Sequence, residues 1–291
     1  MSSPAPLHPS QQMLLRETKL EHGPVPEELD GVPVPPGQHR MAGGAFLLHA
    51  ESGVRFLYRR GAGHVLCEAA DSIDPAELAL WHNGSVYAAV AALNGLRPFH
   101  ASAIAHAGLV IAFTAPGGGG KSTIAAALAA RGFALFADDT LVLDLGDPDH
   151  PVCLPGHKRL KLTAEALALT GLERQEQVAP DYPKHYALPP RAEPLGVLPL
   201  AGLVFLEYAE QPELIGLSGA ERFARLQDTH DTDAFWRTAQ GADRAGLFAA
   251  QAGLARSTAM WRLRRPRNLA QFGASLDLAE SVVDQLTGAA R

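Results

Sequence analysis

Short apolar runs with strand-like composition dominate the chain between residues 45 and 67. Residues 46–48, 54–58 and 64–67 are rich in leucine, valine and aromatic side chains, and glycines separate each run from the next. Glycines between such runs are typical of turns that join neighbouring strands. The pattern therefore predicts a small antiparallel sheet in this part of the chain.

A helical pattern follows. Asp74 and Pro75 are typical of a helix start, with a capping side chain and then a proline at the first helical position. We expect a helix from there to about Leu93, with an interruption at Asn83-Gly84. The first 40 residues, by contrast, are rich in proline and polar side chains. We expect much of that stretch to be extended or loosely ordered.

The stretch at residues 108–123 organises the rest of the chain. An apolar run from Leu109 to Thr114 leads into four consecutive glycines, then Lys121, and then an alanine-rich helical segment at residues 124–131. A strand, a glycine loop, Lys-Ser and a helix, in that order, identify a phosphate-binding P-loop. A flexible glycine-rich turn is the alternative, and the Lys-Ser-Thr sequence at the correct offset argues against it.

The residue types of this loop suit the binding of ATP. Glycine lets the backbone wrap a phosphate with its N–H groups pointing inward, and the first helical turn adds unpaired N–H groups. Lys121 supplies a cation for the outer phosphates, and the Ser122 hydroxyl can bind Mg²⁺. Ala115 replaces the opening glycine of the motif, and so small a residue should be tolerated. The predicted nucleotide-binding residues are Pro116, Gly117, Gly118, Gly119, Gly120, Lys121, Ser122 and Thr123.

A second apolar run, at residues 133–137, ends at Asp138-Asp139. A hydrophobic strand that ends in carboxylates downstream of a P-loop resembles a Walker B arrangement. One acid can hold Mg²⁺ while the other faces the attacking nucleophile. Adjacent strand residues point to opposite faces, so only one of the two needs to enter the site. Capping of the strand end is the alternative, and the P-loop upstream makes it the weaker one.

The composition limits the partners of the protein. Hydrophobic residues make up 47% and charged residues 19% of the 291 residues, and the formal net charge is −6. This balance argues against nucleic acids and acidic membranes, which favour basic surfaces. No apolar run approaches a membrane span and residues 1–12 lack signal-peptide features, so we expect a cytoplasmic protein. Cys67 and Cys153 lack metal or redox spacing and are expected to be buried.

With these motifs, the chain resembles the HPr kinase family and its relatives among bacterial lasso-peptide tailoring kinases. The likeness lies in the His-Ala-Ser-Ala segment at residues 100–103, in the P-loop, and in residues 131–132 and 137–139. The Leu-Glu-x-Arg-Gly signature of HPr kinases proper is absent, which argues against HPr as the substrate and against phosphorylase activity. A weaker likeness to the lasso branch covers residues 154–156, 159–162, 192–195, 203–206 and 261–267.

The resemblance implies a role for each matching residue. Asp138 matches the acid that acts as a base toward the substrate hydroxyl, and His100 matches a histidine that lines the site. Asp139 with Ser122 would bind Mg²⁺, and Lys121 would stabilise the transferred phosphoryl group. For His100, a structural hydrogen bond is an equal alternative. Several basic residues could contact phosphate or substrate, and a solvent-exposed position is the favoured interpretation for most of them. Arg267 is favoured slightly more, because residues 266–270 resemble a segment of HPr kinases. These basic residues are Lys158, Arg159, Lys161, Lys184, His185, Arg191, Arg262, Arg264, Arg265 and Arg267.

We therefore predict an α/β protein with an HPr kinase-like P-loop domain at residues 97–291 and a smaller N-terminal α+β unit at residues 1–96. The predicted function is ATP- and Mg²⁺-dependent phosphorylation of a serine hydroxyl on a peptide or protein. The resemblance implies the C-terminal residue of a lasso precursor peptide as the acceptor. A non-catalytic nucleotide-binding regulatory module and a small-molecule kinase are the alternatives. We expect no nucleic-acid or membrane partner, and the resemblance is compatible with a homo-oligomer.

Overall fold

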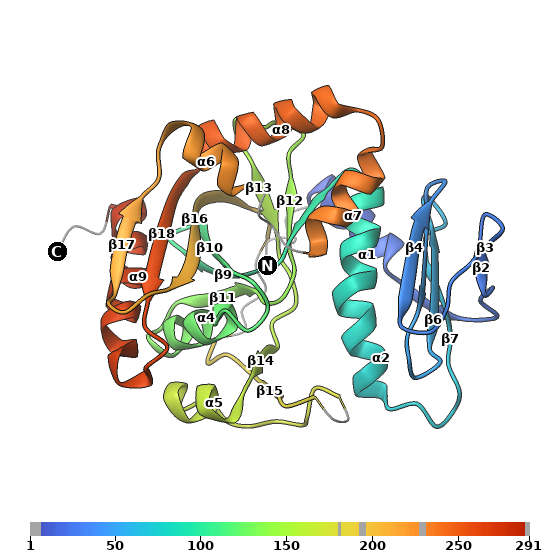
Figure 1. Ribbon diagram of the computed structural model, residues 1–291, viewed down its shortest axis with the longest axis horizontal. Helices are drawn as coiled ribbons and strands as arrows, with labels where there is room; N and C mark the ends of the chain where they lie inside the picture. The colour runs from blue at the N-terminus through green and yellow to red at the C-terminus, as the bar shows by residue number, and fades with distance from the viewer. Residues whose placement is uncertain (1–6, 180–181, 192–195, 227–230, 289–291) are drawn as a thin grey trace, which may run out of the picture.

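The computed structural model describes residues 7–179, 182–191, 196–226 and 231–288. Figure 1 shows a larger α/β part and, to its right, a smaller β-sheet, with a helical rod between them. The fold is mixed α/β, as the sequence predicts. Among the described residues, no helix is both long and apolar enough to cross a membrane.

The smaller sheet has the strand order β1-β7-β6-β5-β4. Three of its strands, β5 (Ala45–His49), β6 (Arg55–Arg59) and β7 (Val65–Glu68), pair antiparallel, which confirms the predicted antiparallel sheet. One face of this sheet packs on the helical rod and on α1, and the other face is covered by the β2–β3 hairpin.

The early part of the chain is more ordered than its composition predicts. Packing against the sheet explains this order, since Leu14 of the first helix is buried in the same core as the sheet. Pro9 occupies the first position of that helix, where a missing N–H is tolerated. The elements formed are α1 (Pro9–Glu17), β1 (Leu20–His22), β2 (Glu28–Leu29), β3 (Val32–Pro33) and β4 (Gln38–Ala42).

The helical rod consists of α2 (Pro75–Trp81), the π-helical turn η1 (His82–Val86) and α3 (Tyr87–Leu93). Asp74 caps the rod by accepting a hydrogen bond from the backbone N–H of Ala76 (2.8 Å), which confirms the predicted start. The predicted interruption at residues 83–84 falls within the π-helical turn. Such wide turns are frequent at functional sites.

The larger sheet has the order β11-β9-β10-β16-β13-β12-β8, and β18 pairs with both β16 and β17. The long strand β16 pairs with β13 through its first residues and with β10 and β18 through the remainder. The strands predicted before the P-loop, before the two aspartates and at residues 203–206 are all present. The strands are β8 (Arg97–Phe99), β9 (Ala101–His106), β10 (Leu109–Thr114), β11 (Ala134–Ala137), β12 (Leu141–Asp144), β13 (Val152–Leu154), β16 (Leu198–Tyr208), β17 (Glu213–Gly216) and β18 (Ala259–Arg265).

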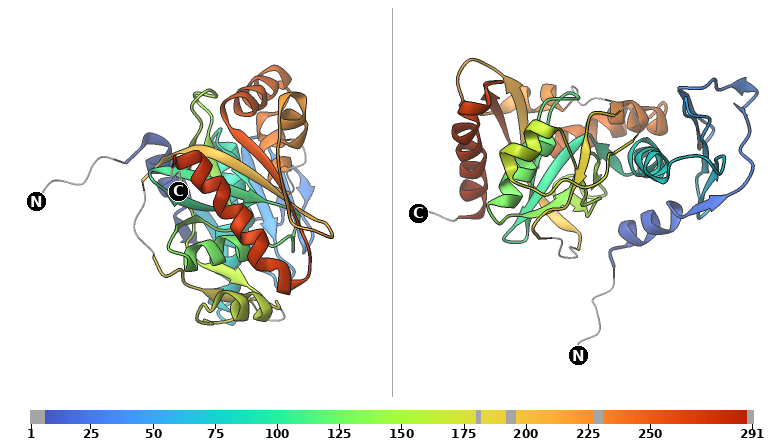
Figure 2. Two further views of the ribbon diagram at one scale, coloured as in Figure 1. Left: turned by 90° about the vertical axis from the view of Figure 1, so that its left-hand side faces the viewer. Right: turned by 90° about the horizontal axis from the view of Figure 1, so that it is seen from below.

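Helices cover both faces of this sheet. α4 (Lys121–Ala130) and α9 (Phe272–Thr287) pack on one face, and α6 (Gly219–Arg225) and α8 (Arg244–Ser257) pack on the other. Figure 2 shows α9 lying along its side of the sheet, where the predicted closing helix was expected. The remaining elements are β14 (Leu160–Leu162), α5 (Ala164–Thr170), β15 (His185–Ala187), α7 (Asp231–Gln240) and η2 (Leu269–Gln271).

The strand directions bring the predicted site residues to one edge of the sheet. β10, β16 and β18 are parallel, and β9 runs antiparallel between β10 and β11. The C-terminal ends of β10 and β11 therefore lie beside the start of β9. Ligands of α/β proteins bind at such an edge. It carries His100, the P-loop and the Asp138-Asp139 pair.

Candidate active site

The P-loop connects β10 to α4 with little freedom in its residue types. Gly120 precedes the helix with φ of +83°, a left-handed conformation that favours glycine. A Cβ at Gly119 would lie 2.5 Å from the Cβ of Ala115, which is closer than van der Waals contact allows. Ala115 is itself buried beneath the loop. The loop therefore requires these two glycines and accommodates the alanine that departs from the motif.

Lys121 lies in the first turn of α4, directly behind the loop. Its ammonium group is buried and donates hydrogen bonds to the carbonyls of Ala115 (2.9 Å) and Pro116 (3.3 Å). The positive end of the helix dipole lies at the same point. Ser122 follows in the same turn and is partly exposed. Positive charge and backbone N–H groups thus gather where P-loops bind phosphates.

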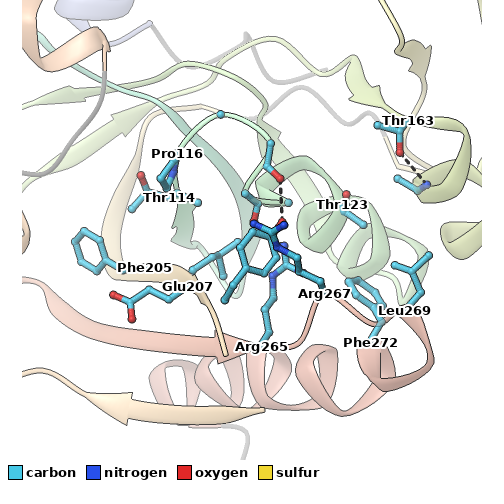
Figure 3. Close-up of a pocket in the computed structure, with 18 of the residues that line it drawn as sticks. Thr114, Pro116, Thr123, Thr163, Phe205, Glu207, Arg265, Arg267, Leu269 and Phe272 are labelled. Atoms are coloured by element: carbon cyan, nitrogen blue, oxygen red, sulfur yellow. Dashed lines mark hydrogen bonds between the residues drawn. The ribbon is translucent and has the colours of Figure 1, made fainter. Parts of the chain in front are cut away.

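A cavity of about 960 Å³ opens beside the P-loop (Figure 3). It is bounded by the loop, by the C-terminal ends of β16 and β18, and by the starts of α5 and α9. Its volume lies within the range of pockets that bind small molecules and cofactors. Six of the predicted nucleotide-binding residues line it: Pro116, Gly117, Gly118, Gly119, Gly120 and Thr123.

Two side chains that the sequence analysis did not assign to the site also line this cavity. Arg265, expected to be solvent-exposed, is only 7% exposed and donates from Nη2 to the carbonyl of Gly119 (2.6 Å). Tyr208 donates its hydroxyl to the carbonyl of Gly118 (3.1 Å). The guanidinium carbons of Arg265 and Arg267 lie 4.9 Å and 4.4 Å from the centre of the Tyr208 ring. Strand alternation is the signal that identifies Arg265, since it follows the buried Leu263 by two residues.

Asp138 is buried, and each oxygen of its carboxylate accepts a hydrogen bond. Its carboxylate accepts a hydrogen bond from the Ser102 hydroxyl (2.5 Å) and another from the backbone N–H of Lys161 (3.1 Å). Its own backbone N–H donates to the carbonyl of His157 (3.0 Å). Asp138 therefore ties β11 to β9 on one side and to β14 on the other.

Asp139 has different surroundings. Its backbone has φ of +71°, a left-handed conformation that is uncommon for a non-glycine residue. Its carboxylate pairs with the Lys161 ammonium (2.8 Å) and lies 3.7 Å from Nδ1 of His100. Burial raises the pKa of Asp139, but Lys161, His100 and Lys121 outweigh burial and lower the pKa below its ordinary value. The carboxylate is therefore held in its ionised form beside the P-loop lysine.

Lys161 was interpreted from the sequence as solvent-exposed, and the structure corrects this. Its side chain is only 12% exposed. Burial lowers the pKa of Lys161, but Asp139 and Asp138 raise it by more, so it stays protonated. The signal in the sequence was weak, because Lys161 stands between two leucines of a three-residue strand whose pairing depends on residues 185–187.

The N-terminal unit also reaches this side of the site. A Cβ built on Gly84 of the π-helical turn would lie 3.7 Å from Oδ2 of Asp139. The next helix contributes Tyr87, whose ring lies 5.4 Å from the ring of His157 in an edge-on contact. Burial, together with the positive charges of His82 and Lys161, lowers the pKa of His157 to about 4, although Asp139 acts in the opposite direction. The smaller part of the molecule thus forms one wall beside Asp139.

The oxygen donors at the site fit Mg²⁺ held mainly by a nucleotide. Among the described residues, no group of three or more His, Cys, Asp or Glu side chains could hold a metal ion alone. Mg²⁺ usually binds through one or two protein oxygens together with substrate phosphates and water. Ser122, in the first turn of α4, and the Asp139 carboxylate are donors of that kind. Their chemistry suits Mg²⁺ and does not suit Zn²⁺, which prefers nitrogen and sulfur.

Comparisons with known proteins add a weak structural likeness. No protein-family model matches the chain, and no curated protein matches it. Among solved structures, the chain is similar to the HPr(Ser) kinase/phosphatase from Coxiella burnetii, with 11% sequence identity and a TM-score of 0.33. The match covers 65% of this chain and 98% of that one. A likeness at this level assigns no family and does not bear on the lasso-tailoring branch, so the function has to be inferred from the site.

Proposed function

We propose that the protein is an ATP-dependent kinase that transfers a phosphoryl group to a serine hydroxyl of a peptide or protein. One observation carries the proposal: a phosphate-binding loop and a partly exposed, ionised carboxylate lie together at one sheet edge. Lys121 of the loop is close enough to Asp139 to help lower its pKa. In-line phosphoryl transfer needs donor and acceptor groups placed side by side in this way.

The nucleotide side of the site consists of the P-loop and Lys121. The loop N–H groups would hold the phosphates of ATP, with the ammonium of Lys121 at the outer ones. Mg²⁺, bound through Ser122 and phosphate oxygens, would neutralise the charge that develops during transfer. The cavity beside the loop leaves room for the rest of the nucleotide.

Asp138 and Asp139 have different roles in the transfer step. The resemblance assigns the base to Asp138 and the metal ion to Asp139, and both assignments remain predictions. The geometry favours a different division, because Asp138 is 2% exposed and already accepts hydrogen bonds from Ser102 and Lys161. We propose that Asp139 accepts the proton of the substrate and that Asp138 acts as a positioning residue. By binding the backbone of Lys161, Asp138 would keep the ammonium group of that lysine against Asp139.

In the transfer step, the serine oxygen forms a bond to the γ-phosphorus of ATP. The bond between that phosphorus and the β,γ-bridging oxygen breaks, and its electron pair leaves with ADP. The serine proton passes to Asp139, which Lys161 and His100 hold in place. Because its pKa is lowered, Asp139 is ionised at neutral pH and can accept a hydrogen bond from the hydroxyl before transfer.

The finer assignment of the acceptor, the C-terminal serine of a lasso precursor peptide, is supported by the sequence resemblance alone. Two of the segments that carry it, residues 154–156 and 159–162, border the carboxylates: Gly156 donates to the carbonyl of Phe136 (3.2 Å), and Lys161 pairs with Asp139. A third, residues 192–195, lies outside the described residues. A cytoplasmic location and a homo-oligomeric state remain predictions.

The test uses purified protein, ATP labelled at the γ-phosphate, Mg²⁺ and a peptide ending in serine. We expect label on this peptide, none on a matched peptide ending in alanine, and no transfer in excess chelator. ATP binding without transfer to any acceptor would overturn the proposal in favour of a nucleotide-binding regulatory module. Transfer to small alcohols but not to peptides would overturn it in favour of a small-molecule kinase.

A further inference from the structure

Arg265 is a buried cation at the nucleotide side of the site. It is the last residue of β18 and lies opposite Tyr208 of β16, and only 7% of its surface is exposed. Its Nη2 lies 2.1 Å from the point where a Cβ of Gly120 would stand, so the guanidinium directly covers the backbone of the P-loop. Figure 3 shows the side chains of Arg265 and Arg267 directed into the cavity beside the loop.

The charge of Arg265 has no partner of opposite sign in the described part of the chain. Within the described part of the chain, no carboxylate lies within ion-pair distance of it, and its buried Nε has no hydrogen-bond partner. The nearest acid along the paired strand, Glu207, is instead paired with Arg225 and lies 3.9 Å from Arg262. Its neighbour Arg264 pairs with Glu213 (2.9 Å) on the other face of β18. A buried cation without a counter-charge is costly, unless an anion joins it.

We propose that Arg265 binds the phosphate chain of the donor nucleotide as a second cation beside Lys121. The proposal rests on the nucleotide site of the proposed function and adds to it a contact from β18, a strand that lies far from the P-loop in sequence. A planar guanidinium is well suited to phosphate oxygens, because it presents several N–H donors in one plane. The Tyr208 ring stacks with the guanidinium and limits its movement, and the Tyr208 hydroxyl is itself anchored on the loop at Gly118.

Gly120, the last loop residue before Lys121, leaves room for this guanidinium. Any Cβ at Gly120 would collide with Arg265. The loop and the arginine are therefore fitted to each other. The guanidinium occupies the side of the loop that faces the cavity, where the phosphates of a bound nucleotide would pass.

The test measures MgADP binding by calorimetry and by the rise in melting temperature, in the intact chain. Arg265→Gln keeps a donor for the Gly119 carbonyl but removes the charge. We expect about a tenfold or larger loss of MgADP affinity, the scale of one charge-assisted hydrogen bond. Arg265→Lys should lose less than Arg265→Gln, because it retains the charge. Without nucleotide, Arg265→Gln should melt no lower than the wild type, since it removes an unbalanced buried cation. The matched control, Arg264→Gln, should bind as the wild type does.

Three results would overturn the proposal. They are wild-type MgADP affinity in Arg265→Gln, equal losses in the Gln and Lys variants, and failure of Arg265→Gln to fold, which would show a structural role. Wild-type protein that binds MgADP but phosphorylates no peptide would overturn the kinase function and leave the role of Arg265 standing. Wild-type protein that does not bind MgADP would overturn both.

Discussion

The nucleotide side and the carboxylate side of the site differ in whether their charged side chains are paired. On the nucleotide side, Lys121 and Arg265 donate to backbone carbonyls of the P-loop, and Arg265 has no carboxylate within ion-pair distance among the described residues. On the carboxylate side, Asp139 already has a partner of opposite charge: it pairs with Lys161 at 2.8 Å and has His100 at 3.7 Å. The first side attracts an anion, and the second already holds an ion pair.

This difference indicates how the two sides contribute to transfer. An unbalanced positive site gains electrostatic stabilisation when phosphates bind and again when charge shifts within them. A balanced ion-pair site gains little from a new charge, but it fixes the orientation of its groups and sets their pKa. We therefore expect substitutions on the nucleotide side to affect binding and rate together. Substitutions on the carboxylate side should affect mainly rate and its dependence on pH.

The largest effect is expected for Lys121→Ala. Removing this cation should lower the rate of phosphoryl transfer by about a thousandfold, the scale of losing one charge that stabilises such a transition state. The fold should survive, because the hydrogen bonds from Lys121 to the Ala115 and Pro116 carbonyls lie within the loop and do not join it to another element. Single-turnover transfer and circular dichroism provide the measurements. Turnover at the wild-type rate would show that this loop is not the donor site.

Asp139→Asn should have the next largest effect. The change keeps the size of the side chain and removes the proton acceptor, so turnover should fall by about a hundredfold. MgADP affinity should change by only a few-fold, which calorimetry can check. A large loss of Mg²⁺-nucleotide affinity would instead restore the metal-binding role that the sequence resemblance assigns to Asp139.

Asp138→Asn is the matched variant. It disturbs the hydrogen bond from Ser102 and the bond from the Lys161 backbone, so it should lower both turnover and melting temperature. Full stability combined with the larger loss of turnover would show that Asp138 is the base, as the sequence resemblance implies.

Local patterns in the sequence were sufficient to predict much of the fold. The P-loop strand and helix, the antiparallel strands at residues 45–68, the cap at Asp74 and the closing helix α9 are confirmed. The early elements α1 to β4 were not predicted, because their order comes from packing against a sheet formed by later residues. The composition of these early residues does not indicate contacts with residues so far away in sequence.

The site residues that belong to a continuous sequence motif could be predicted. The site residues that the fold brings in from distant strands could not. His100, Lys121 and Asp139 are brought together, because β10 and β11 end and β9 begins at one edge of the sheet. Lys161 and Arg265 were interpreted as surface charges, because the residues that bury them lie on strands far away in sequence. The Gly84 turn could be placed in its helix but not beside Asp139, since that contact joins the two parts of the molecule.

A smaller effect is expected for Lys161→Met, which removes the cation paired with Asp139. The pKa of Asp139 should rise, because burial then meets less opposition from positive charge. The ionised carboxylate is the active form, so the acid limb of the pH–rate profile should move to higher pH. Arg159→Met is the control, since Arg159 pairs with Glu176 and should leave the profile unchanged. An acid limb at its wild-type position in Lys161→Met would contradict the pairing.

The smallest expected effect concerns stability and His157, which links the carboxylate side to the N-terminal unit. Burial is the main reason that its pKa is lowered to about 4 from the ordinary value of 6.5. Between these two pH values the unfolded chain binds the proton more readily than the folded chain does. Stability should therefore fall as the pH drops from 6.5 to 4, by at most about 3 kcal/mol for this group. Burial also lowers the pKa of His82, which acts in the same direction.

Urea unfolding of the wild type and of His157→Gln across this pH range measures the effect. Glutamine cannot titrate here, so the free energy of unfolding of the variant should depend less on pH. The gap between the two proteins should narrow toward pH 4, whatever the packing loss at pH 7. His106→Gln, at an exposed histidine, is the control for the substitution itself. A constant gap between wild type and His157→Gln would show that His157 is not held neutral, and that the wall beside Asp139 is open to water.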